Sequence, residues 1–269
     1  MSTFILKPKP PLYEYAFCQG FPKQLERLAG LASPEKWDYM RAHNPSPYPI
    51  LFNYIQHTFK RVKEEHDSFG QGEQSTKICA ASDKTCFNTG LYTANYEPIY
   101  GLFGPNDIPG QQDRYLIGFF KESDFNLRQF SRLPDRASYF SDIADLLFDA
   151  RLPMRINIDH ILETPENIQR LPKELQQIDR SYVRTIFDGA LSTVRKKLAA
   201  NYKLAIPQYY NGRVQLLIPL VLNPTGQADL ALAIYREEQH YAGRTCLTLD
   251  MAYNNARLIV KPESDWLRP

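Results

Sequence analysis

The stretch from Asn201 to Ile259 constrains the fold more than any other part of the chain. Within it, Asn211-Gly212 separates two apolar segments, and an Asn-Gly pair readily adopts the positive φ angles of a tight hairpin turn. The segment Val214–Leu222 is almost unbroken in apolar residues, which is typical of a central strand that is covered on both faces. Pro207 supplies no amide donor, so the strand before the turn is expected at an edge of the sheet or at a bulge.

Two further strands extend this pattern. The loop residues Asn223 to Gln227 lead into a strand over Ala228–Arg236, and the loop Glu237–Gly243 leads into a strand over Arg244–Asp250. We therefore expect a meander of four antiparallel strands in one sheet, which a short polar-faced element follows. The helix expected over residues 178–202 should pack on one face of this sheet, because its apolar positions recur at helical spacing.

The chain before this meander carries mixed signals for helices and strands. Helices are expected over residues 22–32, 33–37, 50–66 and 139–148, and short strands over 77–81, 85–87, 91–93, 98–103 and 115–120. Strands, helices and strands in this order favour an α+β fold with a mainly antiparallel sheet. We expect an extended lead and short helices over residues 1–48, followed by a single α+β domain over residues 49–269.

Composition favours an ordinary globular protein. The chain has 269 residues, of which 43% are hydrophobic and 23% charged, and its net charge of +2 is too small to imply a polyanionic partner by itself. No apolar run is long enough to cross a bilayer, and the first residues lack the features of a secretory signal. A cytoplasmic location without membrane contact is the resulting expectation.

The cysteines argue against a metal site. Cys18, Cys79, Cys86 and Cys246 show no paired CxxC spacing, so zinc is not expected and reduced, packed thiols are. Cys79 and Cys86 could still face each other across a hairpin. The sequence points to no particular cofactor and leaves the oligomeric state open.

Several common active-site motifs are missing from the sequence. It contains no GxxxxGK[ST], no GxGxxG after a strand, no HExxH and no GxSxG. These absences disfavour P-loop, Rossmann and zinc-protease chemistry and the nucleophile elbow of hydrolases. Any active site would therefore be assembled from dispersed residues.

Two short motifs are the first candidates for such a site. Asn88-Thr89-Gly90 offers an amide, a hydroxyl and a backbone N–H that together could hold a phosphate or carboxylate, although a hairpin turn stabilised by its own Asn side chain explains the same residues. Asp159-His160 places a carboxylate beside a histidine in an apolar frame, which suits a general acid or base. A structural hydrogen bond or a helix start is the alternative for His160.

The densest polar cluster lies at the two ends of the meander. It comprises Lys203, Gln208, Asp250, Tyr253, Asn254, Asn255 and Arg257. Arg257 has the planar fork of donors that suits a phosphate, and buried amides need partners because an unpaired one costs about 1–3 kcal/mol. Either these groups contact a polar ligand or they form a structural network between sheet and helix.

Basic and aromatic residues alternate in the same region. The positions are Arg195, Lys196, Lys197, Lys203, Tyr209, Tyr210 and Arg213. Such a mixture can follow a nucleic-acid backbone while its rings stack on bases. A solvated helix face beside edge-strand tyrosines is the alternative.

Separated sequence blocks resemble one known family in the same order. They are Asn88–Leu91, Ile99–Phe103, Asn157–Ile161, Asn201–Tyr209 and Leu247–Ile259, and over roughly residues 12–267 the chain resembles the domain of unknown function 3825 family. The family carries no established reaction that can be transferred. Its members look to occur beside cold-shock and helix-turn-helix modules, so the resemblance implies an association with RNA.

Three functional hypotheses follow. The first is an enzyme, a phosphodiesterase or nucleotide-phosphate hydrolase, that acts on a phosphate ester or RNA end, with His160 transferring a proton and Lys203 and Arg257 stabilising negative charge. The second is a noncatalytic RNA- or nucleotide-binding module that uses the same surface. The third is a protein-interaction domain, which suits an aromatic content of 13%.

The location of the polar residues separates these hypotheses. One anion-binding pocket is expected to hold the Asn88-Thr89-Gly90 turn, Lys203, Gln208, Asp250, Asn254, Asn255 and Arg257. Convergence of His160 on that pocket would favour the enzyme. Dispersal over an open basic face would favour the binding module.

Overall fold

The computed structural model describes residues 10–39, 48–70 and 75–267. These residues form two compact units, an N-terminal unit (Met1–Ser138) and a C-terminal unit (Tyr139–Pro269). This division differs from the expected boundary near residue 48, because the helix after that position packs within the N-terminal unit. Residues 1–9, which include most of the expected extended lead, lie outside the described residues, and so do residues 40–47, which belong largely to a Pro-rich segment that the sequence suggests is a linker.

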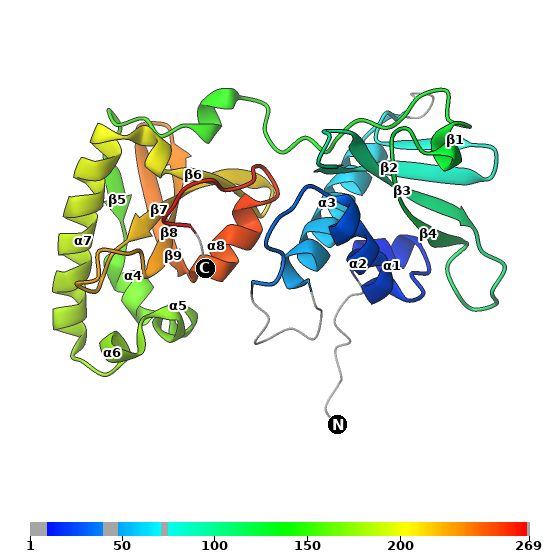
Figure 1. The fold of residues 1–269 in the computed structure, drawn as a ribbon. Helices are drawn as coiled ribbons and strands as arrows, with labels where there is room; N and C mark the ends of the chain where they lie inside the picture. The colour runs from blue at the N-terminus through cyan, green and yellow to red at the C-terminus, as the bar shows by residue number, and fades with distance from the viewer. Residues whose placement is uncertain (1–9, 40–47, 71–74, 268–269) are drawn as a thin grey trace. The chain divides into compact units, whose positions relative to one another are not determined.

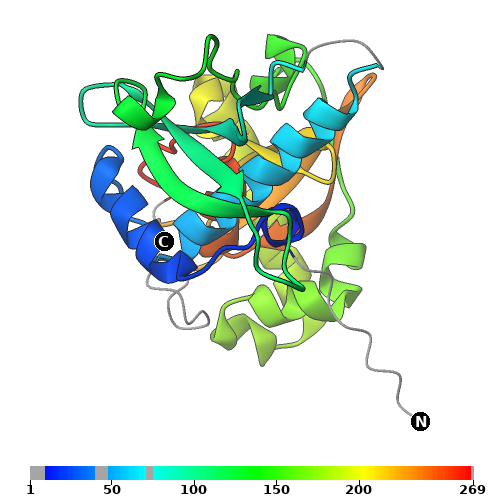
Figure 2. The ribbon, with the colours of Figure 1, turned by 90° about the vertical axis from the view of Figure 1, so that its right-hand side faces the viewer.

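The N-terminal unit is a four-stranded antiparallel sheet with helices on one face (Figures 1 and 2). Its strands pair in sequence order, β1-β2-β3-β4. Its elements are α1 (Pro11–Tyr15), α2 (Phe21–Leu31), α3 (Pro49–Asp67), β1 (Ile78–Ala81), β2 (Lys84–Tyr92), β3 (Pro98–Pro105), β4 (Arg114–Lys121) and the short 3-10 helix η2 (Phe125–Leu127). The helix α3 covers one face, and the segment after β4 covers the other.

An aromatic cluster joins α3 to the sheet. The ring of Phe59 on α3 lies 5.0 Å from that of Phe87 and 5.7 Å from that of Phe103, both in edge-on contacts. Such pairs contribute beyond the area that they bury. The Phe87 ring lies across Gly101 of β3, where an added Cβ would come within 2.2 Å of a ring carbon. Gly101 therefore makes room for the ring that anchors α3.

The C-terminal unit is built on a five-stranded sheet in the order β5-β9-β8-β7-β6. Its strands are β5 (Met154–Ile156), β6 (Ile206–Tyr210), β7 (Arg213–Leu220), β8 (Leu230–Glu237) and β9 (His240–Leu247). Its helices are η3 (Ile143–Leu146), α4 (Ile158–Glu163), α5 (Pro165–Arg170), α6 (Lys173–Gln176), α7 (Arg180–Ala200), η4 (Tyr202–Leu204) and α8 (Leu249–Ala256). The four-strand meander and the α+β class are confirmed, and β6 is an edge strand, as expected. β7 is an interior strand next to that edge, whereas the central strand of the sheet is β8.

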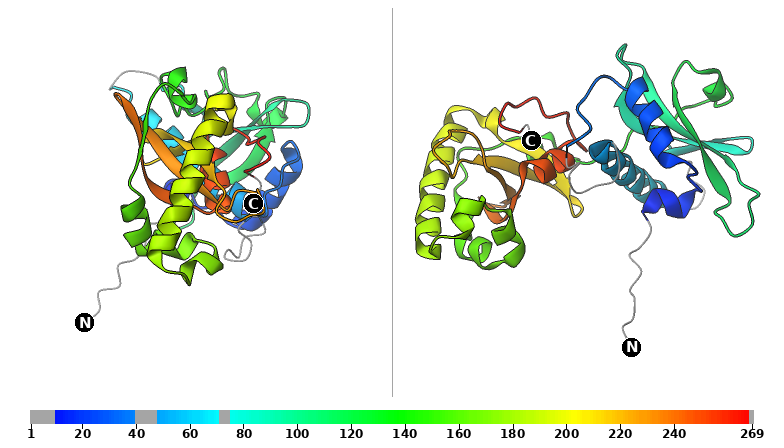
Figure 3. Two further views of the ribbon diagram at one scale, coloured as in Figure 1. Left: turned by 90° about the vertical axis from the view of Figure 1, so that its left-hand side faces the viewer. Right: turned by 60° about the horizontal axis from the view of Figure 1, so that its bottom comes forward.

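Different helices pack on the two faces of this sheet (Figures 1 and 3). One face buries Leu216, Ile218 and Leu232 in a core that contains Phe187 and Val194 of α7. The alternate residues of the same strands face the other way, where α8 packs on β6, β8 and β9. The helices α7 and α8 therefore lie on opposite sides of the sheet.

Several expectations about local structure are wrong. The last strand of the meander, β9, begins at His240 inside the expected loop Glu237–Gly243, and Asp250 belongs to α8 rather than to this strand. Residues 139–148 form only the short η3, with the side chain of Ile143 70% exposed, because the ring of Phe148 instead stacks on that of Tyr241 at 5.0 Å. Residues 33–37 are not helical, since the amide of Ser33 donates to the carbonyl of Tyr92 in β2. The expected strands at 85–87 and 91–93 are one strand, β2.

The cysteines are free thiols in the structure. Cys79 and Cys86 are directly opposite each other in the hairpin of β1 and β2, as the sequence analysis considered, but they form no disulfide. Burial raises the pKa of both thiols, which keeps them protonated and poorly reactive near neutral pH.

We predict that Gly101→Ala destabilises the protein by about 1–3 kcal/mol, because the new methyl group must displace the Phe87 ring from a packed core. The measurement is urea denaturation followed by circular dichroism. Gly30→Ala is the matched control, since Gly30 lies in α2 with open space around it and alanine favours a helix. Equal stability of the two variants would contradict the packing argument.

Candidate functional site

The polar residues after the last strand lie on α8 and at its C-terminal end. Thr248 caps this helix, and its hydroxyl accepts a hydrogen bond from the Met251 amide. Asp250 lies in the first turn, where a carboxylate suits the helix dipole. Arg257 is the C-terminal capping residue, and its amide donates to the Tyr253 carbonyl. Asn254 and Asn255 are half-buried between these positions.

A chain of amides ties α8 to the edge of the sheet. Asn255 donates its side-chain amide to the Gln208 oxygen at 3.1 Å, and Gln208 donates in turn to the Gln215 oxygen at 2.8 Å. Gln208 is only 1% exposed, so both ends of its amide are satisfied inside the protein. For Gln208 and Asn255 the geometry therefore supports the structural network rather than direct contact with a ligand.

His160 lies on the other side of the sheet. It is an exposed residue of α4, and its backbone amide donates to the Asn157 side chain, which caps that helix. The neighbouring Asp159 forms an ion pair with Arg184 of α7. Because α4 shares the core of α7 whereas Arg257 ends α8, the sheet separates His160 from Arg257. The C-terminal unit does not bring these two predicted catalytic residues together.

The residues of the predicted nucleic-acid face lie in two separate regions of the C-terminal unit. Arg213, in the hairpin of β6 and β7, lies over the Tyr235 ring at 4.0 Å, and the ring of Tyr209 contacts that of Tyr139 at 5.0 Å. Lys196 and Lys197 are exposed near the C-terminal end of α7, where Arg195 donates to the Met154 carbonyl. The five residues of β6 separate this end from the hairpin by roughly 15 Å.

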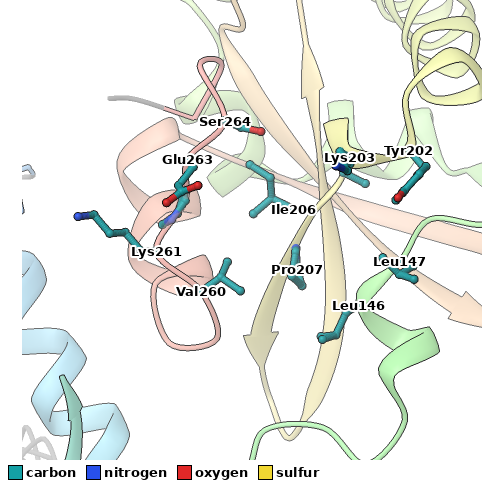
Figure 4. A pocket seen from close by; sticks show the side chains of 12 residues that line it. Leu146, Leu147, Tyr202, Lys203, Ile206, Pro207, Val260, Lys261, Glu263 and Ser264 are labelled. Atoms are coloured by element: carbon teal, nitrogen blue, oxygen red, sulfur yellow. The ribbon is translucent and has the colours of Figure 1, made fainter. Parts of the chain in front are cut away.

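Lys203 lines a pocket of about 360 Å³ at the β6 edge of the sheet, here called the edge pocket. Figure 4 shows η4 on one side, the chain after α8 on another, and β6 between them. Its lining residues are Leu146, Leu147, Tyr202, Lys203, Ala205, Ile206, Pro207, Val260, Lys261, Pro262, Glu263 and Ser264. An apolar floor thus meets a polar rim that carries two lysines, a tyrosine and a carboxylate.

A second pocket, of about 500 Å³, adjoins η4 and is here called the tryptophan pocket. Lys197 and Trp266 both line it. The Trp266 indole donates to the Leu204 carbonyl at 2.9 Å, which holds the ring in place. Because η4 and the C-terminal segment contribute to both pockets, the two pockets are neighbours, with Lys203 lining one and Lys197 the other.

Sequence reasoning missed the C-terminal segment of this site. The segment after α8 is rich in charged and polar residues, and none of them was predicted as a site residue. It contains Lys261, Glu263 and Trp266. The one available signal was Trp266 itself, since a large ring among charged residues is expected to pack against something.

The Asn88-Thr89-Gly90 motif is neither a hairpin turn nor an open anion cradle. It is a bulge inside β2, where Gly90 has a φ of 74° and the pairing with β3 shifts. The Asn88 side chain accepts from the Gly90 amide and donates to the Pro134 carbonyl, while the Thr89 hydroxyl donates to the Ile99 carbonyl. The donors expected to hold an anion are therefore used within the protein.

Asn88 and Lys203 belong to different units, which the structure describes separately. Their meeting in one pocket, together with Arg257, stays a prediction.

Within the described residues, no group of three or more His, Cys, Asp or Glu residues is placed to hold a metal ion. None of the helices in these parts of the chain is long and apolar enough to span a bilayer.

A family model described as "Domain of unknown function (DUF3825)" matches residues 28–266, which cover most of both units. The chain belongs to this family. The match confirms the resemblance of the sequence blocks and extends over α8 and the C-terminal segment that lines the edge pocket. No curated protein and no solved structure matches the chain.

We predict that Asn255→Ala lowers the free energy of unfolding by about 1–3 kcal/mol, because the buried Gln208 oxygen loses its donor. Thermal denaturation measures the effect, and Gln177→Ala, which removes an exposed amide from the same unit, should leave the melting temperature unchanged. A neutral Asn255→Ala combined with weakened binding of phosphate-containing ligands would instead support the ligand-contact hypothesis.

Proposed function

We propose that the C-terminal unit is a noncatalytic module that binds RNA or nucleotides at the edge and tryptophan pockets. The observation that carries this proposal is the placement of Tyr202 and Lys203 side by side on the edge pocket (Figure 4), with Lys197 and Trp266 on the adjoining one. Two cations and two rings on adjoining surfaces are the elements that single-stranded nucleic acid requires.

Each element has a defined task. Lys197 and Lys203 offer ammonium groups to phosphates, and neither forms a side-chain ion pair or hydrogen bond with another described residue. Tyr202 is 49% exposed, so its ring is available for a base to stack on. Glu263 lines the same pocket and can accept hydrogen bonds from ribose hydroxyls, which distinguish RNA from DNA.

The size of the edge pocket suits this ligand. Its volume of about 360 Å³ falls in the lower part of the range of roughly 300–1,000 Å³ that is typical of small-molecule sites. The apolar floor of Ile206, Pro207 and Val260 can cover one face of a base or sugar. A single nucleotide therefore fits the pocket, and a longer strand can continue past Lys197.

Binding is favoured over catalysis by the position of the proton-transfer candidate. A general acid or base must lie within hydrogen-bond reach of the reacting group. His160 is on the α7 side of the sheet and is not among the residues that line either pocket. The hydrolase hypothesis would need another proton-transfer group, whereas the binding hypothesis needs none.

We predict that Lys203→Ala weakens binding of a fluorescent single-stranded RNA and reduces the slope of log affinity against log salt concentration by about 0.7, since one phosphate contact is lost. Tyr202→Ala should weaken binding by about 1–3 kcal/mol with an unchanged salt slope, because stacking involves no counterion. Fluorescence anisotropy at several salt concentrations measures both quantities.

Lys173→Ala is the control for charge, because it removes an exposed lysine from α6 in the same unit. Arg213→Ala should have a smaller effect than Lys203→Ala, since its guanidinium already lies on the Tyr235 ring. Wild-type affinity in a Lys197→Ala, Lys203→Ala double variant would reject the site. Shortened RNA or released phosphate after incubation with the wild-type protein would reject the noncatalytic assignment.

A further inference from the structure

A separate pocket, of about 640 Å³, lies in the N-terminal unit. Asn88, Tyr100 and Phe120 pair in a row across β2, β3 and β4, so their side chains share one face of the sheet. This is the face opposite α3, and the segment that follows η2 covers it (Figure 2). The pocket is lined by Asn88, Tyr100, Glu122, Phe130, Ser131, Leu133, Pro134, Asp135 and Arg136, and is here called the phenol pocket.

The hydroxyl of Tyr100 is the unusual group in this pocket. Tyr100 is only 5% exposed, and its ring packs with Cys86, Leu102 and Phe130. No hydrogen bond joins its hydroxyl to another described residue, and the oxygen is not among the fully buried unpaired atoms, so it is open to the pocket. Burial raises the pKa of Tyr100 to about 12, and the nearby Glu122 carboxylate acts in the same direction. The phenol therefore stays neutral at physiological pH, and its oxygen can accept a hydrogen bond.

The charges around this hydroxyl are mainly negative. Glu122 forms no side-chain ion pair or hydrogen bond with another described residue, and Asp135 is paired at 3.2 Å with the exposed Arg132. Arg136 lies over the Tyr92 ring at 5.5 Å and donates to the Tyr92 hydroxyl, so its guanidinium is engaged at the rim. A ligand that enters the pocket thus meets a carboxylate, a phenol oxygen and the ring of Phe130.

We propose that the phenol pocket binds a small organic cation with N–H donors, an amine or a guanidine. The cation donates hydrogen bonds to the Glu122 carboxylate and the Tyr100 oxygen, and its charge faces the Phe130 ring, in the arrangement that binds ammonium groups elsewhere. The Glu122 carboxylate, which has no ion-pair partner among the described residues, disfavours an anion. Within the described residues, no group of three or more His, Cys, Asp or Glu side chains is placed to hold a metal ion here.

This inference does not depend on RNA binding by the C-terminal unit. The phenol pocket and the two pockets beside η4 share no residue. Variants of either site can therefore be tested for both ligands, and the failure of one proposal leaves the other standing.

The test is isothermal titration calorimetry of the full chain with putrescine and agmatine. Butanediol of the same chain length as putrescine is the uncharged control, and choline is a cation without N–H donors. We expect saturable binding of at least one of the two amines, and no binding of butanediol or choline. Absence of binding by both amines, or equal binding of choline, overturns the proposal.

Two variants locate the site. Tyr100→Phe keeps the ring and removes the hydroxyl, so it should weaken amine binding about tenfold, as expected for one lost hydrogen bond, without lowering the melting temperature. Glu122→Gln removes the negative charge and should weaken binding at least as much. Glu26→Gln, an exposed carboxylate on α2, is the matched control and should bind like the wild type. Unchanged binding in both pocket variants places any amine site elsewhere and rejects the proposal.

Discussion

The alternation of side chains along β7 determines the layout of the C-terminal unit. Leu216, Ile218 and Leu220 point to the α7 side, while Gln215 and Leu217 point to α8. A slip of one residue would exchange these sets and bury Gln215 in the apolar core beneath α7. The hairpin at Asn211-Gly212, where both residues have positive φ angles, holds β7 in register against β6. The core and the amide chain both depend on this register.

The path of the chain explains why the predicted catalytic residues do not meet. The strands β5 and β6 lie at opposite edges of the sheet, so the helices between them must cross one whole face. That crossing places α4, and with it His160, on the α7 side. The other face remains for α8, which ends at Arg257. The separation of His160 from Arg257 is therefore a consequence of topology rather than of local side-chain packing.

Much of the C-terminal sheet could be predicted because its signals are local. An Asn-Gly turn, an apolar run and a proline at an edge each act over a few residues, and all three agree. The pairing of β5 with β9 joins residues about 87 positions apart, such as Met154 and Tyr241, and no local pattern marks it. The helix expected at 139–148 failed for a related reason. Apolar spacing alone does not show that Phe148 finds a better partner in Tyr241 than a helical neighbour would provide.

The candidate site also depends on contacts between residues far apart in the sequence, which local patterns do not mark. Lys203 was singled out from sequence, but its neighbours Lys261 and Glu263 come from a segment about 60 residues later. What brings them together is the return of the chain after α8, secured where the Trp266 indole donates to the Leu204 carbonyl. That bond fixes the C-terminal segment to η4, directly before the edge strand β6. The surface that the RNA proposal requires thus rests on the docking of this segment, and removing the indole should disturb both pockets while leaving the buried β7 core in place.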